Sequence, residues 1–392
     1  MVFVGIDIAK TNHVACAVDE TGEKLTRPLP FKNAEEGFEK LAAWLEGVAE
    51  DPCDAFIAME ATGHYWMACF SFLAAREYKA CVVNPMQVKA MRKLKGRSRV
   101  KNDPIDSWLI AETLRLGEAV ETKMATDEVQ SLKTLTRYRQ ALKQELATIK
   151  TQCICVLDSY FPEYAGHFSD PFGAASLAVL KKCPMPEDLG RVRASTLAKE
   201  MSEASRGRIS GEKAAELKAA AKKSIGVKLG ADAASFQIKS MIGQMEFLDE
   251  TISKVEGRVA DLLMAIEPLI VTVPGVSTAT GAQIVAEIGD VRRFRNASVI
   301  VKYAGLDSGV SQSGQFEAKG EPITKQGSPY LRRSIWLAAN QCRRFDPTMK
   351  AYYDKLRAQG KCHRVAVTAC ARKLCHIIYA IMRDQVAYGA NR

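Results

Sequence analysis

Four acidic side chains lie where carboxylates could act together on a phosphate. Asp7 lies inside the apolar run "FVGIDIA", and Glu60 closes the apolar run "AFIAME". Asp103 and Asp106, within "KNDPIDSWLIAE", are three residues apart and would share one face of a helix. A lone carboxylate among apolar neighbours is costly unless it is paired or bound to a metal. If these four oxygen-bearing groups meet in space, they would bind two Mg²⁺ ions about 3.5–4 Å apart, an arrangement suited to phosphoryl transfer.

Two of these acids, taken alone, have a purely structural explanation. Asp103, which precedes Pro104, is a good N-cap for a helix with proline at its first position. Asp7 could be a strand residue near a sheet edge. The metal-site hypothesis therefore depends on all four acids occurring together, in this order and on suitable elements.

A basic run, "KAMRKLKGRSRVK" (89–101), leads directly into the two aspartates. The chain as a whole carries a net charge of +10, which points to a polyanionic partner. The run is either a solvated basic loop or a surface that holds a nucleic-acid backbone. The residues that we expect to contact nucleic acid are Lys89, Arg92, Lys93, Lys95, Arg97, Arg99 and Lys101, with Lys325, Arg332 and Arg333 further along the chain.

The first 125 residues predict an α/β domain that would position these acids. Strand patterns cover 2–9, 12–25 (two strands joined by a "DETG" turn), 54–60 and 79–84, and helical patterns cover 34–49, 65–76 and 103–116. Three strands followed by alternating helices and strands is the order of the RuvC-type, ribonuclease-H-like fold. In that fold the first and fourth strands are neighbours, so Asp7 and Glu60 would converge.

The rest of the chain predicts mainly helices. Two long patterns, 126–161 and 233–266, have apolar spacing near 3.5 and predict an antiparallel coiled coil within 126–268. A helical insertion at about 165–230 lies between them. The carboxyl-terminal part, 269–392, opens with "VTVPGVSTATGAQIVAEIGD", which either forms a helix-hairpin-helix that binds a DNA phosphate or is a tight turn between helices.

The eleven cysteines show no C-x-x-C spacing and predict reduced residues, most of them buried, in a reducing compartment. The two "CH" pairs, at 362–363 and 375–376, lack the spacing of a zinc finger. No apolar run reaches the roughly 18 residues of a membrane span, and no secretory signal precedes the first strand. We therefore expect a cytoplasmic protein without a membrane partner.

These motifs together resemble a known family. "GIDIAK", "MEATGHYW" and "KNDPIDSWLIA" are similar to the three acidic motifs of the DEDD transposases of the insertion-sequence 110 family. "VPGVSTATGAQIVAEIGDVRRF", "YAGLDSGVSQSGQ" and "ITKQGSPYLRRSIWLAA" are similar to that family's second conserved region. The resemblance extends over essentially the whole chain.

The resemblance implies a recombinase that excises and inserts a mobile element. It implies a metal-binding tetrad of Asp7, Glu60, Asp103 and Asp106, and a serine nucleophile that forms a phosphoserine intermediate. That serine matches Ser313, with Ser311 as the alternative. The implied partners are donor and target double-stranded DNA, a guide RNA encoded by the element, and further copies of the chain in a dimer or tetramer. The implied setting is the nucleoid of a bacterium or archaeon.

Two departures from the family pattern stand out, and two other functions stay open. The insertion at about 165–230 is long for the family's spacer, and Ser308 stands where proline is commoner. A nuclease of the same fold would resolve DNA junctions with water and no serine. A non-catalytic nucleic-acid-binding protein would use the acids as caps. The carboxyl-terminal region with its "SG" element favours the recombinase.

Overall fold

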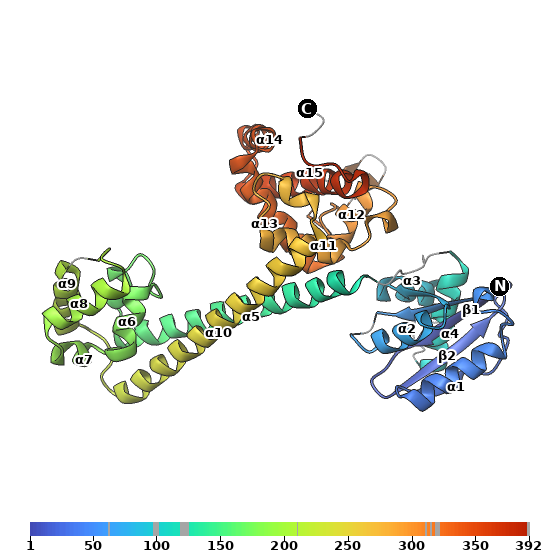
Figure 1. The fold of residues 1–392 in the computed structure, drawn as a ribbon, viewed down its shortest axis with the longest axis horizontal. Helices are drawn as coiled ribbons and strands as arrows, with labels where there is room; N and C mark the ends of the chain where they lie inside the picture. The colour runs from blue at the N-terminus through green and yellow to red at the C-terminus, as the bar shows by residue number, and fades with distance from the viewer. Residues whose placement is uncertain are drawn as a thin grey trace. The chain divides into compact units, whose positions relative to one another are not determined.

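The chain divides into two compact units, Met1–Met124 and Ala125–Arg392, each built around its own apolar core (Figure 1). The computed structural model describes residues 1–61, 63–96, 102–117, 125–209, 211–309 and 322–389. It also describes the backbone of 312–313 and 316–317.

The first unit contains a five-stranded mixed sheet. Its strands are β1 (Val2–Asp7), β2 (Asn12–Val18), β3 (Leu29–Lys32), β4 (Ala55–Glu60) and β5 (Lys79–Val83), in the order β3-β2-β1-β4-β5. The first three strands pair antiparallel, and β4 and β5 add in parallel beside β1. This is the strand order of the ribonuclease-H-like fold, as the sequence predicts.

One predicted strand is misplaced. The third strand was expected directly after the "DETG" turn, but there only Lys24 forms an isolated bridge, to Val18. The observed β3 comes later in the chain, at Leu29–Lys32, where it pairs antiparallel with residues Asn12–Ala15 of β2.

Helices cover both faces of this sheet. Helices α1 (Glu35–Glu46) and α2 (Trp66–Ala74) pack on the face that carries Val4 and Ile6. Helices α3 (Pro85–Leu94) and α4 (Asp103–Arg115) cover the opposite face, and a short turn, η1 (Pro52–Asp54), leads into β4.

The second unit begins with two long antiparallel helices, α5 (Asp127–Tyr160) and α10 (Ala231–Ile266). Near one end of the pair, Arg139 Nη2 lies 2.6 Å from Glu256 Oε1. At the other end, the backbone N–H of Val227 donates to the carbonyl of Ser159 at 3.0 Å. The antiparallel pairing is therefore observed, while the regular coiled-coil geometry stays a prediction.

The segment between the long helices, residues 161–230, is called the tip segment below. Its elements are η2 (Tyr164–His167), α6 (Ala174–Lys182), α7 (Pro186–Arg191), α8 (Ala194–Ala204) and α9 (Gly211–Lys222). They share an apolar core with the ends of α5 and α10, with Phe161 and Tyr164 fully buried at its centre.

The carboxyl-terminal part is mainly helical. Its elements are η3 (Leu269–Thr272), α11 (Thr278–Ile288), η4 (Val291–Arg293), α12 (Ala297–Tyr303), β6 (Gln312–Ser313), β7 (Phe316–Glu317), α13 (Pro329–Phe345), α14 (Pro347–Ala358) and α15 (His363–Asp384). The turn before α11 packs inward, because a Cβ on Gly275 would lie 2.6 Å from the backbone nitrogen of Cys342 in α13. This contact gives the "VPGVS" turn a packing role, and phosphate binding by it stays a prediction.

Helix α15 is apolar overall, although Arg372 and Lys373 interrupt its sequence. It is the one helix within the described residues that could cross a membrane, by its length and composition alone. Several of its apolar side chains, among them Val367, Leu374 and Ile378, are buried in the carboxyl-terminal core, whereas Val365 is exposed.

Most cysteines are buried, as the sequence predicts. None of the eleven cysteines is in a disulfide, and eight are buried. Burial raises the pKa of the Cys69, Cys81 and Cys375 thiols to about 12, so these thiols stay protonated and unreactive at neutral pH.

Candidate active site

Asp7 and Glu60 end two neighbouring parallel strands. The register of β1 and β4 pairs Ile6 with Met59, and the two acids are the next residue on each strand. Residues at matching positions of neighbouring strands point to the same face of a sheet. The register therefore supports the sequence prediction that these two carboxylates converge, at the carboxyl ends of β1 and β4.

The face that carries Asp7 is the face covered by α4. A Cβ on Gly5, two residues before Asp7, would lie 2.1 Å from the carbonyl oxygen of Ser107 and 2.3 Å from the nitrogen of Ala111. Only glycine allows the helix backbone to approach the strand this closely. Because side chains alternate along a strand, Asp7 faces the same side as Gly5.

The direction of α4 brings its acidic first turn toward the ends of β1 and β4. At the far end of the helix, Arg115 Nη1 donates to the carbonyl of Glu20, just after β2 ends, at 3.2 Å. The helix therefore runs from the carboxyl end of β1 toward its amino end, with Asp103 and Asp106 in its first turn.

The structural explanation proposed for Asp103 is wrong. The N-cap of α4 is Asn102, whose side-chain oxygen accepts the backbone N–H of Ile105 at 3.0 Å. Asp103 is the first helical residue, followed by Pro104, and its side chain is exposed. The Asp103 carboxylate therefore takes no part in capping the helix.

Asp106 is buried and already has a cationic partner. Its carboxylate accepts a hydrogen bond from the guanidinium of Arg92 on α3. Among the residues that the structure describes, no three His, Cys, Asp or Glu side chains are grouped closely enough to hold a metal ion. The donor types of the four acids suit Mg²⁺, and Arg92 competes with a metal ion for the Asp106 carboxylate.

A second buried acid on α4 was missed in the sequence. The Glu112 side chain is 1% exposed and pairs with Lys95 and with Arg115, whose Nε donates at 2.7 Å. Burial by itself would raise the pKa of Glu112, but the hydrogen bonds from Arg115 and Lys95 outweigh it and hold the pKa below its usual value. Its sequence signal is an acid between Ala111 and Thr113, on a helix that faces the sheet.

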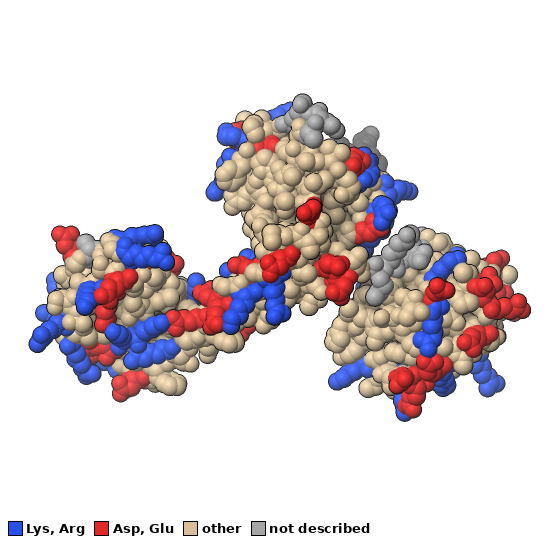
Figure 2. Space-filling model, viewed as in Figure 1, with Lys and Arg blue, Asp and Glu red and all other residues tan. Residues whose placement is uncertain are grey.

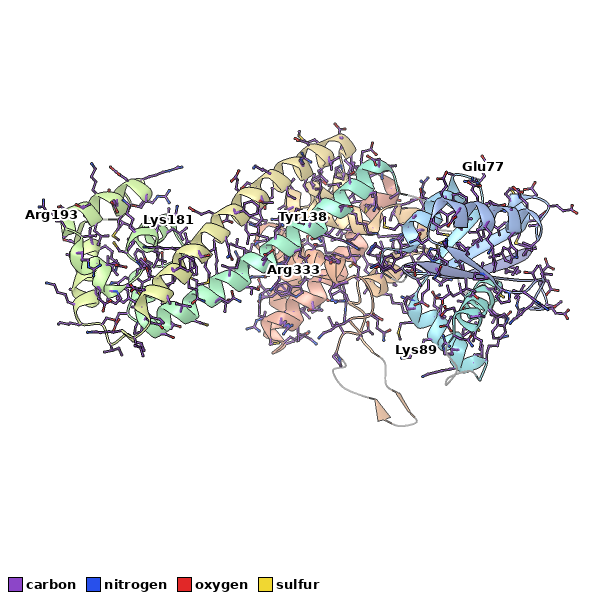
Figure 3. All side chains as sticks on the ribbon, turned by 90° about the horizontal axis from the view of Figure 1, so that it is seen from below. Glu77, Lys89, Tyr138, Lys181, Arg193 and Arg333 are labelled. Carbon is purple, nitrogen blue, oxygen red and sulfur yellow. The ribbon has the colours of Figure 1, made fainter. Side chains whose placement is uncertain are left out.

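The predicted nucleic-acid contacts differ in their availability. Lys89 and Lys93 are exposed, whereas Arg92 and Lys95 are held by Asp106 and Glu112 (Figure 3 marks Lys89). Arg97, Arg99 and Lys101 lie outside the described residues.

In the second unit, Lys325 and Arg333 are exposed, while Arg332 has a structural role. The Arg332 Nη1 donates to the carbonyls of Ala304 at 3.1 Å and Lys325 at 3.2 Å. Arg333 is labelled in Figure 3.

Ser313 lies in β6, which pairs antiparallel with β7 to form a short hairpin. The side chain of Ser313 and the whole of Ser311 lie outside the described residues. The base of the hairpin is described. The hydroxyl of Thr324 donates to Asp307 at 2.6 Å, and Ser308 bridges to Ile323.

Side chains from α13 and α15 fasten this base to the helical core. Besides Arg332, Arg372 on α15 donates its Nε to the carbonyl of Leu306 at 2.6 Å. Gly305 has a φ of +63°, and a Cβ there would lie 2.8 Å from the Arg332 guanidinium. We call these contacts of Arg332 and Arg372 the hairpin clamp.

A buried acid also ties α11 to its neighbours. Glu287 accepts hydrogen bonds from Arg137 of α5 at 2.6 and 2.9 Å, and from the hydroxyl of Ser328 at 2.9 Å. Ser328 is the N-cap of α13. These bonds fix the start of α13 against both α11 and α5.

The first unit therefore defines a class of protein: a ribonuclease-H-like domain with acidic residues at the carboxyl ends of adjacent strands. Comparison with known proteins agrees. Residues 4–162 match a family model described as a DEDD transposase of the IS110 type, and residues 267–354 match one described as "Transposase IS116/IS110/IS902 family".

Relatives match along almost the full length. The 43.6 kDa protein of insertion element IS110 from Streptomyces coelicolor is 25% identical, over 100% of this chain and 96% of its own length. The mini-circle putative transposase for IS117 from the same organism is 24% identical, over 93% of this chain and 90% of its own. The pilin gene-inverting protein of Moraxella bovis is 23% identical, over 97% and 96%.

A solved structure, T. thermophilus RuvC in complex with a Holliday junction substrate, also matches. It has a TM-score of 0.24 and 18% identity, over 31% of this chain and 99% of that one. The fold assignment rests on the strand order described above. The chain belongs to the IS110 family of DEDD transposases and is a DNA-cleaving and DNA-recombining enzyme.

Proposed function

We propose that this transposase moves its element through a covalent phosphoserine intermediate on Ser313, with Ser311 as the alternative. The carboxylates of Asp7, Glu60, Asp103 and Asp106 would hold two Mg²⁺ ions for this reaction. The observation that carries the proposal is the register that ends β1 and β4 in adjacent acids, beneath a helix whose first turn bears two more.

The acids fit a metal site by donor chemistry. Carboxylate oxygens are the ligands that Mg²⁺ prefers, and Mg²⁺ bound there would stabilise the negative charge that develops on the scissile phosphate. Asp7 and Glu60 provide two such groups from the rigid sheet. Asp106 would join them once Arg92 is drawn away, for which a DNA phosphate is a suitable competing anion.

The serine step is a transesterification. The Oγ of Ser313 forms a bond to the scissile phosphorus and loses its proton to a base or to solvent, while the bond from phosphorus to one sugar oxygen breaks and that oxygen takes up a proton. A DNA hydroxyl from the other strand end later reverses the step and frees the serine. No external energy source is needed, because one phosphoester replaces another.

The partners are proposed at a finer level from the resemblance to the family. They are donor and target double-stranded DNA, an element-encoded guide RNA, and other copies of the chain in a dimer or tetramer. The exposed cations Lys89, Lys93, Lys325 and Arg333 are available for phosphate contacts. The net charge of +10 agrees with such partners.

Trapping the covalent intermediate tests this function. The wild-type chain, incubated with Mg²⁺, guide RNA and a DNA substrate, should give a protein–DNA adduct that survives denaturation. Ser313→Ala and Asp7→Asn should each reduce the adduct about a thousandfold or more, without loss of DNA binding. Ser308→Ala is the matched control and should retain the adduct.

The outcomes separate the alternatives. An adduct that persists in Ser313→Ala and disappears in Ser311→Ala moves the nucleophile to Ser311. DNA cleavage without any adduct would replace the serine mechanism by hydrolysis with water.

A further inference from the structure

The tip segment contains a surface hollow that nothing in the proposed chemistry uses. It has a volume of about 890 Å³ and lies between the start of α6 and the loop that joins α8 to α9. Its lining includes Arg206, Arg208 and Lys213, together with His167, Phe168 and Asp170. Figure 2 shows Lys and Arg side chains at several places over the tip segment.

Three cations and one carboxylate line this hollow, so its charge is positive on balance. Arg206 and Arg208 are exposed, and within the described part of the chain neither side chain has an ion pair or hydrogen bond. Lys213 pairs only with Glu216 on the same helix, at 3.0 Å and in partial exposure, a type of contact that contributes little stability. Asp170 is the one acid of the lining, and its Oδ1 already accepts the backbone N–H of Phe172 at 2.9 Å.

Arg206 is one of five non-glycine residues with a positive φ in the described part of the chain. Its φ is +56°, a left-handed conformation, in the turn that closes α8 through a hydrogen bond from the Gly207 N–H to the carbonyl of Ser202 at 2.8 Å. Glycine adopts this conformation at lower cost than any residue with a Cβ. A left-handed residue is a common way to end a helix, and Arg206 also lines the hollow.

The other walls suit a nucleotide. Phe168 is half-buried, with its ring centroid 5.2 Å from that of Tyr164, and offers an apolar surface beside the cations. Ala174 and Ala175, at the N-terminus of α6, also line the hollow, and no side chain caps this end of the helix. Their backbone amides would not define a site alone, but they add hydrogen-bond donors to one that the arginines define.

We propose that the hollow binds backbone phosphate of a nucleic-acid strand, held by Arg206, Arg208 and Lys213. A volume of about 890 Å³ lies within the range of about 300–1,000 Å³ found for small-ligand sites, so the hollow is large enough for a nucleotide with its phosphates. The open side of the hollow leaves room for the strand to continue. The inference rests on the proposed function only in that nucleic acid is the partner; it does not depend on the serine chemistry.

Salt dependence measures the number of phosphates held. In the full-length chain, Arg206→Gln combined with Arg208→Gln removes two charges from the hollow. Arg191→Gln combined with Arg193→Gln is the control, since it removes two exposed charges from the same segment outside the lining (Figure 3 labels Arg193). Binding of labelled single-stranded RNA and of labelled duplex DNA is followed by fluorescence anisotropy over a salt series.

The hollow variant should lower the slope of log Kd against log salt by roughly 1.4–1.8, which is about 0.7–0.9 for each phosphate that the protein no longer neutralises. The control variant should lower this slope by less than half of the change seen in the hollow variant. The nucleic acid that shows the larger difference is the natural occupant. Equal slopes in both variants, for RNA and DNA alike, would mean diffuse attraction and would overturn the proposal.

A local readout accompanies the slope. Phenylglyoxal modifies accessible arginines, and modified sites are mapped by mass spectrometry. RNA or DNA should protect Arg206 and Arg208 while Arg191 and Arg193 stay reactive. Equal modification of Arg206 with and without nucleic acid would refute the site. Loss of this site would leave the Ser313 adduct chemistry standing, so the two proposals fail separately.

Discussion

Asp106 and Glu112 lie six residues apart on α4. Arg92 of α3 pairs with Asp106, and Lys95, which directly follows α3, pairs with Glu112. The two acids have different neighbours. Asp106 is in the first turn of the helix, near the carboxyl ends of β1 and β4, where Asp7 and Glu60 lie. Glu112 is deeper along the helix, with Arg115 as a second partner. This difference agrees with the catalytic role proposed for Asp106, and it gives Glu112 the role of holding the end of α3 against α4.

Replacing Glu112 tests its structural role. Glu112→Gln removes a buried charge and leaves Lys95 and Arg115 without their partner, so it should lower the free energy of unfolding by about 1–3 kcal/mol at neutral pH. Glu36→Gln is the matched control, because the Lys32–Glu36 pair is exposed on both sides and its removal should change little. Urea unfolding of both variants measures the difference.

The same variant has a defined pH dependence. The pKa of Glu112 is lowered in the folded chain, so its stabilisation is present above the ordinary carboxyl pKa of about 4.3 and is lost as pH falls through the folded pKa. The deficit of Glu112→Gln should therefore shrink in acid. A deficit that stays constant from neutral pH down to acid unfolding would show that packing, not charge, is responsible.

At the scale of elements, the hairpin β6–β7 depends on the clamp at its base. Arg332 and Arg372 donate to carbonyls at Ala304, Lys325 and Leu306, on both sides of the hairpin. A nucleophile must be held within a fraction of an ångström of its productive position. A loosened base should slow the serine step without weakening DNA binding.

Arg372→Gln should slow adduct formation roughly tenfold at saturating DNA, about 1.4 kcal/mol in the barrier, with unchanged Kd and unfolding temperature. Arg372→Lys should recover part of the rate, because one ammonium hydrogen bond to Leu306 is still available. Arg364→Gln, an exposed arginine on the same helix, should react at the wild-type rate. A parallel loss of rate and thermal stability in Arg372→Gln would reduce its role to folding.

At the scale of the whole chain, four of the five strands of the first sheet were predictable because local rules determine them, whereas the third strand was misplaced. Alternating residues predicted β1 and β4, and the order of strands and helices then placed Asp7 beside Glu60. Long apolar periodicity likewise predicted α5 and α10 to within a few residues.

Pairing between distant side chains was not predictable. The run from Lys89 to Lys101 has the same sequence pattern whether its cations face solvent or a buried acid, yet Arg92 and Lys95 are both engaged internally. The N-cap of α4 was assigned one residue late, because Asn102 and Asp103 have similar capping preference. The backbone contacts of Arg332 depend on a loop conformation that no periodicity encodes.

The proposed mechanism depends most on the binding of divalent cations by the carboxylates of β1 and β4. The direct measurement is anomalous X-ray diffraction from crystals of the chain with DNA and Mn²⁺ in place of Mg²⁺. Manganese peaks should lie beside the Asp7 and Glu60 carboxylates, and the Asp106 carboxylate should be turned from Arg92 toward the metal. DNA bound with its scissile phosphate in place and no manganese at Asp7 or Glu60 would contradict the proposed mechanism.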